Sequence, residues 1–208
     1  MRGGTKEGVD SFAINSYLMN LTIPDEQLMS AAKSGDQVAF AELVDRLTDH
    51  IYGLAFRLLG NSQDAQDITQ DTFIQMWESR HRWSPRGAVS TWAYRIAMNL
   101  CLNRLRSRKR WRLFSINPQT DESPPAVELP IDSADSPETV IEQADLKHHL
   151  ESAISQLPPR ERASIILRHQ QGLSLKEVAK VMDMTAFGVN SLLFRARKRL
   201  QELLSDKK

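Results

Sequence analysis

Apolar residues recur at every third or fourth position along most of this chain, and no stretch keeps the strict alternation that is typical of a half-buried strand. Stop signals at Gly35 and Gly60, and a cap at Asn61 or Ser62, divide the first part of this pattern. The pattern predicts helices over residues 24–34, 36–59, 62–79 and 90–110. We therefore expect an all-α protein.

A second helical part begins near residue 136. Ser136 can cap a helix with Pro137 in its first turn, and a later helix stops at Gly172. Ser174 and Glu177 have the spacing of a capping box, in which each side chain hydrogen-bonds to the backbone of the other residue. The helices expected here cover residues 136–157, 160–171, 175–181 and 185–204. The short turn between the last two predicts a helix-turn-helix.

A stretch of prolines and carboxylates separates the two helical parts. It contains no Lys or Arg between residues 113 and 145, which is typical of a flexible acidic linker. We therefore expect two small helical domains, the C-terminal one containing the helix-turn-helix. The predicted boundaries are an N-terminal extension (1–23), a first domain (24–112), the linker (113–135) and a second domain (136–208).

The charges are sorted along the chain, although the 208 residues carry a net charge of only +1. Carboxylates outnumber cations between residues 25 and 78, whereas residues 79–120 contain many arginines and no Asp or Glu. A sign pattern of this kind indicates separate surfaces for separate partners.

Several classes of protein are disfavoured by the sequence. Cys101 is the only cysteine, so an internal disulfide and a cysteine-rich zinc site are excluded. The longest apolar runs are far shorter than the roughly 20 residues of a membrane-spanning helix, and no secretory leader is recognisable. No histidine and acid cluster or phosphate-cradling glycine loop is visible. We expect a cytoplasmic protein without membrane insertion, metal, cofactor or enzymatic activity.

Two helices have the chemistry of nucleic-acid binding. Residues 90–110 combine Trp92 and Tyr94 with arginines, as in proteins that stack single-stranded bases on rings and hold the backbone in a cationic groove. The alternative is that Trp92 and Ile96 belong to the core of a bundle with a solvated arginine face. The last helix offers polar and basic residues to a major groove. Its alternative is a helical hairpin with a solvated basic face.

Three stretches resemble the sigma factors of bacterial RNA polymerase, specifically the compact extracytoplasmic-function (ECF) group. They are DAQDITQDTFIQMWE (64–78), STWAYRIAMNLCLNRLR (90–106) and the helix-turn-helix. In that family they bind polymerase, melt and read the minus-ten promoter element, and read the minus-thirty-five element. The resemblance implies two helical domains on a flexible linker, and a chain that selects promoters while the polymerase performs the chemistry.

The resemblance also implies roles for individual residues. Core polymerase, through its beta-prime and beta subunits, would meet Asp64, Asp67, Gln70 and Asp71. Minus-ten DNA would meet Trp83, Trp92, Tyr94, Arg95, Asn99, Arg104, Arg106, Arg108, Lys109 and Arg110. Minus-thirty-five DNA would meet Thr185, Asn190, Ser191, Phe194, Arg195 and Arg197. The Asn99 amide suits a flipped base because it has both donors and acceptors.

The residues themselves allow other interpretations of these positions. The acidic row on residues 64–71 can be a solvated helix face, Asn99 can make an interhelical hydrogen bond, and Trp92 can support the preceding loop. The whole chain can instead be a helix-turn-helix regulator that binds duplex DNA without polymerase, or an RNA-binding protein.

This chain also departs from the family pattern. Trp83 stands where many members have phenylalanine, and Leu192 stands where many have a basic residue, so the promoter sequence cannot be transferred. Met19 resembles a usual family start, and we predict it as an alternative initiation site. Members of this group are commonly held inactive by an anti-sigma factor that covers both domains, and we expect such a partner here.

Overall fold

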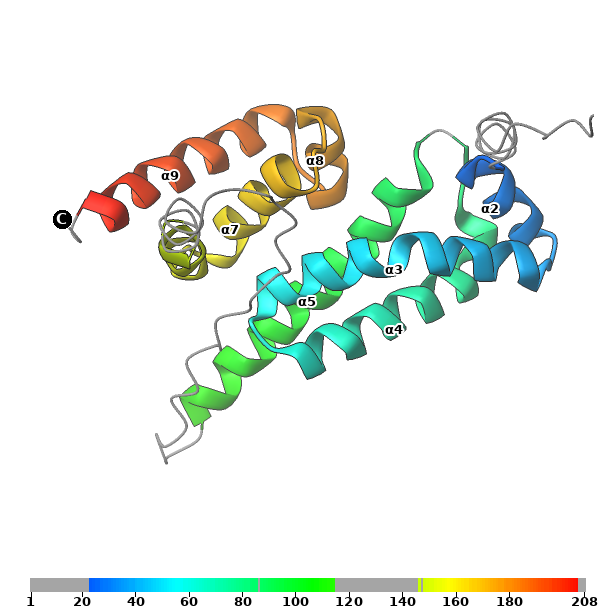
Figure 1. Cartoon of the computed structure of the whole chain (residues 1–208), viewed down its shortest axis with the longest axis horizontal. Helices are drawn as coiled ribbons and strands as arrows, with labels where there is room; N and C mark the ends of the chain where they lie inside the picture. The colour runs from blue at the N-terminus through cyan, green and yellow to red at the C-terminus, as the bar shows by residue number, and fades with distance from the viewer. Residues whose placement is uncertain (1–22, 86, 115–145, 147, 206–208) are drawn as a thin grey trace, which may run out of the picture.

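The structure is a computed structural model that describes residues 23–85, 87–114, 146 and 148–205 (Figure 1). Regular secondary structure within these residues is entirely helical, which confirms the all-α prediction. The alternative start at Met19, the predicted linker beyond residue 114 and the predicted cap at Ser136 lie outside the described residues.

The first helices begin and end at capping residues. α2 spans Asp25–Lys33, α3 spans Gln37–Leu59 and α4 spans Ser62–Glu78. The Asp36 carboxylate accepts hydrogen bonds from two backbone N–H groups of the first turn of α3, at 2.9 and 3.0 Å. Gly60 ends α3 with a φ of +67°, a left-handed conformation that favours glycine, and Asn61 caps α4. These caps confirm the predicted division.

A short 3-10 turn, η1 (Arg80–Arg82), leads to the long helix α5, which spans Val89–Phe114. α5 continues four residues beyond the predicted end at Arg110, because no proline or glycine interrupts the helix there. The helices α3, α4 and α5 pack together around apolar stripes. The most deeply buried side chains of this core are Leu43, Ile51, Leu54, Leu58, Met76 and Met98.

The C-terminal part begins with helical residues at 148–155. α7 (Pro159–Ile165) follows and continues as one π-helical turn, η2 (Ile166–Gln170), before Gly172 with a φ of +68°. α8 (Leu175–Met182) opens with the predicted capping box, in which Ser174 and Glu177 exchange hydrogen bonds of 2.8 and 3.3 Å. Asp183 turns the chain with a φ of +52° into α9 (Ala186–Ser205).

The predicted helix-turn-helix is present as α8, the turn at Asp183 and α9. Val178 and Ala179 of α8 are buried against Val189 and Leu193 of α9. Leu192, which departs from the family pattern, is also buried, with only 4% of its surface exposed. Its position is therefore a core position in this chain, and the departure does not alter the exposed face of α9.

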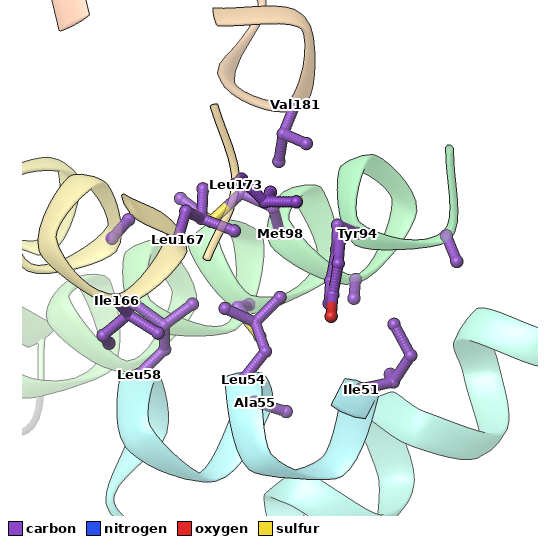
Figure 2. Close-up of a cluster of buried hydrophobic side chains, with 14 of the residues drawn as sticks. Ile51, Leu54, Ala55, Leu58, Tyr94, Met98, Ile166, Leu167, Leu173 and Val181 are labelled. Atoms are coloured by element: carbon purple, nitrogen blue, oxygen red, sulfur yellow. The ribbon is translucent and has the colours of Figure 1, made fainter. Parts of the chain in front are cut away.

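The two domains lie against each other in this structure. Figure 2 shows Leu54 and Leu58 of α3 facing Ile166 and Leu167, and the buried hydrophobic cluster continues across both domains. The Arg162 guanidinium donates a hydrogen bond of 3.0 Å to the backbone carbonyl of Leu58. α8 packs beside α5. None of the helices in the described residues is long and apolar enough to cross a membrane.

Candidate functional site

The acidic row on α4 divides into an exposed part and a buried part. Gln70 and Asp71 are exposed, and the Asp67 side chain is 43% exposed. The Asp64 side chain is only 12% exposed, because it faces α5 and forms ion pairs with Arg104, at 3.1 Å, and with Arg108. The surface that α4 offers to a partner therefore starts at Asp67, and Ile74 adds an apolar side chain to it.

The cations of α5 also divide into two groups. Arg104 and Arg108 are held at α4 by Asp64, and Arg108 lies 3.3 Å from the Leu59 carbonyl oxygen as well. Arg106, Lys109 and Arg110 are exposed to solvent. The first group braces the bundle, whereas the second group makes a positive surface at the end of α5.

The aromatic residues near the start of α5 are largely covered. Trp83 and Tyr94 each have 5% of their surface exposed, and Trp92 is partly buried against the core. The Tyr94 hydroxyl donates a hydrogen bond of 2.8 Å to Gln171 of the C-terminal part, and burial raises the pKa of Tyr94. In this conformation, these rings do not form an open platform for bases. Trp111 of α5 is exposed, at 74%, and its sequence context predicted no role for it.

Asn99 lies on the surface of α5 where the two domains meet. It lines a pocket of about 170 Å³ together with Arg106 of its own helix, Arg160 of α7 and Asp183 of the turn before α9. The Asn99 side chain makes no interhelical hydrogen bond among the described residues, so the structural alternative for this amide finds no support. Arg95, one turn earlier, lies 3.6 Å from the Asp183 carboxylate.

The outer face of α9 presents only some of its predicted DNA contacts freely. The Thr185 hydroxyl accepts a hydrogen bond from the Gly188 N–H at 3.1 Å, and the Ser191 hydroxyl donates one to the Phe187 carbonyl, also at 3.1 Å. Arg195 lies 3.6 Å from the buried carboxylate of Glu161. The remaining predicted contacts are exposed; they are Asn190, Phe194 and Arg197.

The described residues contain no group of three or more His, Cys, Asp or Glu side chains that could hold a metal ion. Cys101 is fully buried, and this burial, together with the nearby Asp64 carboxylate, raises the pKa of its thiol to about 12. The thiol therefore stays protonated at neutral pH and behaves as a small apolar core residue.

Two family models match this chain, Sigma-70 region 2 over residues 43–111 and Sigma-70, region 4 over residues 148–200. The ECF RNA polymerase sigma factor SigW of Bacillus subtilis is 32% identical over 174 residues, which cover 84% of this chain and 93% of SigW. The ECF RNA polymerase sigma factor SigE of Mycolicibacterium smegmatis is 35% identical, over 83% of this chain and 65% of SigE. This chain thus spans just under two thirds of the mycobacterial relative.

Solved structures share the fold. The sigma factor RpoE of Bartonella quintana, solved with the anti-sigma factor NepR, matches with a TM-score of 0.63 at 21% identity, over 81% of this chain and 98% of that one. CnrH, solved with the cytosolic domain of CnrY, matches with a TM-score of 0.62 at 24% identity, over 88% of this chain and 99% of that one. With both sigma-70 regions matched in order and SigW aligned over nearly its whole length, this chain belongs to the ECF group of RNA polymerase sigma factors.

Proposed function

We propose that this protein is a bacterial transcription initiation factor that binds core RNA polymerase, directs it to promoters and helps to melt the minus-ten element. The observation that carries the proposal is the match of both sigma-70 regions to two domains that present surfaces of different charge. The exposed face of α4 is acidic, whereas the end of α5 and the outer face of α9 are basic.

The polymerase would bind the α4 surface made by Asp67, Gln70, Asp71 and Ile74. Exposed carboxylates beside an apolar side chain suit a basic helical partner, here the coiled coil of the beta-prime subunit, with further contacts to the beta subunit. Asp64 supports this surface from behind, because its ion pairs with Arg104 and Arg108 fix α4 against α5. Its contribution to polymerase binding is therefore indirect.

The minus-ten element would lie along α5. Asn99 would read an unpaired base, with Arg95 one turn before it, and the exposed side chains of Arg106, Lys109 and Arg110 would contact phosphates. In the structure Arg95 and Asn99 face α8 and the turn that follows it. Both side chains are exposed, but α8 packs beside α5, so we expect the two domains to move apart when a DNA strand occupies this surface.

The minus-thirty-five element would be read by α9 in a major groove. Asn190 lies on the exposed face of its first half, and Arg197 follows on the same side. An amide near the start of a recognition helix and cations farther along are the arrangement that reads base edges and phosphates.

A cognate anti-sigma factor is a further part of this proposal, together with a cytoplasmic location. The solved RpoE of similar fold is bound to an anti-sigma factor. A protein that encloses both domains of this chain would keep α4, α5 and α9 from polymerase and promoter at the same time.

The proposal is tested by reconstituting the purified protein with sigma-free bacterial core polymerase. The transcripts made from fragmented genomic DNA of the source organism are then sequenced. We expect discrete starts that depend on the protein and share two upstream elements. A folded protein that binds duplex sites but neither joins the polymerase nor creates new starts would instead be a helix-turn-helix regulator.

A further inference from the structure

Phe187 is a large apolar side chain that the structure leaves uncovered at the start of the recognition helix. It lies in the first turn of α9 and is 82% exposed, more than any other large hydrophobic residue among the described residues. No role was assigned to it from the sequence. The inference drawn below rests on the proposed function, because it concerns the helix that we place in the minus-thirty-five major groove.

The polar groups around Phe187 are mostly engaged within the protein. The Thr185 hydroxyl caps α9, and the Ser191 hydroxyl donates to the Phe187 carbonyl. Val189 and Leu192 are buried. The first two turns of α9 therefore offer chiefly the Phe187 ring and the Asn190 amide to a ligand.

The backbone that carries Phe187 is closely packed. A Cβ atom added at Gly188 would lie 3.1 Å from the Met184 side chain and 3.4 Å from the Thr185 hydroxyl oxygen. The left-handed residue Asp183 and the cap at Thr185 fix the turn that precedes it. The position of the Phe187 Cβ is therefore set by the fold, and only the ring rotates.

The charge of α9 favours a polyanion such as DNA over a basic or neutral protein surface as the occupant of this face. From Ala186 to Gln201 the helix carries no carboxylate, and it contains Arg195, Arg197, Lys198 and Arg199. Early residues of a recognition helix reach base edges, and phenylalanine makes apolar contact with the C5-methyl group of thymine. We propose that Phe187 is a specificity-determining residue that reads a thymine methyl group in the minus-thirty-five element.

The experiment uses the full-length protein bound to core polymerase. Promoter sites are first selected from a randomised duplex library, and each thymine upstream of the melted region is then replaced singly by deoxyuridine, which lacks only the methyl group. At one thymine of the minus-thirty-five element, we expect deoxyuridine to weaken wild-type binding roughly fourfold, the effect of one methyl-sized apolar group. The Phe187→Ala variant should bind both duplexes equally.

Val38→Ala is the control, because Val38 is 81% exposed in the first turn of α3 and no contact with polymerase or DNA is assigned to it. This variant should keep the methyl effect at the thymine read by Phe187. The inference is overturned if no thymine shows a methyl effect, or if the effect persists in a folded Phe187→Ala variant. If Phe187→Ala weakened binding to core polymerase and left the methyl effect unchanged, Phe187 would be a protein-docking residue and the inference would be overturned. If no site is selected at all, the proposed function fails as well.

Discussion

At the scale of single residues, Asp64 shows how tertiary contacts change the role of a residue in a row. Its sequence neighbours Asp67 and Asp71 share its helix face by spacing, yet Asp64 alone is enclosed between Arg104 and Arg108. The Asp64 carboxylate therefore stabilises the packing of α4 on α5, and only 12% of its side chain is exposed to a binding partner. α4 therefore carries one buried structural acid, Asp64, and two acids that reach solvent, of which Asp67 also lies 3.8 Å from Arg104.

Asp64→Ala should lower the free energy of unfolding by about 1–3 kcal/mol, because two guanidinium groups lose their common partner. Denaturant titration followed by circular dichroism measures the change. Asp71→Ala, at an exposed position of the same helix, should stay within about 0.5 kcal/mol of the wild type. Equal effects of the two substitutions would contradict the bracing role of Asp64.

Asn99→Ala should reduce promoter opening about tenfold and weaken the preference for one minus-ten base, because an amide that pairs with a base edge is lost. Binding to core polymerase should not change. Permanganate footprinting of the melted strand and a polymerase binding titration measure the two effects separately. Asn103→Ala is the control, since Asn103 lines the same pocket one turn farther along α5. A similar loss in both variants would refute a specific role for Asn99.

At the scale of helices, two local features can be tested: the acidic surface of α4 and the capping box of α8. The exposed carboxylates Asp67 and Asp71 lie four residues apart and therefore on one face. α3 offers a matched pair, Asp45 and Asp49, which are also exposed and four residues apart. Charge reversal at the two pairs therefore separates an effect of the α4 surface from an effect of the net charge of the protein.

Asp67→Arg with Asp71→Arg should weaken binding to core polymerase at least a hundredfold, because carboxylates at the interface are replaced by like charges facing a basic partner. Fluorescence anisotropy of labelled protein titrated with core polymerase measures the affinity. Asp45→Arg with Asp49→Arg changes the net charge equally and should leave the affinity within about threefold. If both double variants bind alike, α4 is not the docking face.

Ser174→Ala should speed hydrogen exchange of the first backbone amides of α8, in line with a loss of about 1 kcal/mol at pH 7. The hydrogen bonds from Ser174 lower the pKa of the Glu177 carboxyl. A lowered pKa means that this stabilisation is present above the ordinary pKa of a glutamate and is lost as the pH falls below it. The difference between wild type and variant should therefore shrink as the pH falls below the ordinary pKa of a glutamate. A difference independent of pH would show that Glu177 does not contribute.

At the scale of the whole molecule, the C-terminal domain lies against α3 and α5, beside the surface that we propose for DNA. The Tyr94 hydroxyl donates a hydrogen bond to Gln171, and Arg162 donates one to the Leu58 carbonyl. Apolar side chains of both domains pack together in the same contact (Figure 2). Arg95 and Asn99 lie at the edge of this contact and stay exposed, with Arg95 3.6 Å from the Asp183 carboxylate. On the proposed function, we expect a melted strand on α5 to compete with this contact, so that the domains move apart before melting.

Joining the domains chemically should block promoter melting. Asn103 and Arg160 are exposed residues that line the same pocket from different domains. A variant with cysteines at both positions, joined by a short bis-maleimide, should open promoters at least tenfold less than the same variant treated with N-ethylmaleimide. The buried Cys101 should not react. Normal melting by the joined protein would show that the closed arrangement does not obstruct DNA.

The sequence by itself determined the helices, their caps and the family. Caps and stop signals are local, so Asp36, Gly60 and the Ser174 capping box could be recognised from spacing alone. The end of α5 was placed too early, because without proline or glycine no local signal marks where a polar helix stops.

Only the tertiary structure decided which of the predicted contacts are available. The sequence predicted Asp64 and Tyr94 as partner contacts. In the structure, Asp64 forms an ion pair with Arg104 of α5, and the Tyr94 hydroxyl donates a hydrogen bond to Gln171 of the C-terminal domain. The sequence did not predict the exposure of Phe187, which is 82% exposed because no other helix of the described residues packs against it. Periodicity assigns a residue to a face of its own helix, whereas burial depends on which other helix lies against that face, and residues distant in sequence determine that packing.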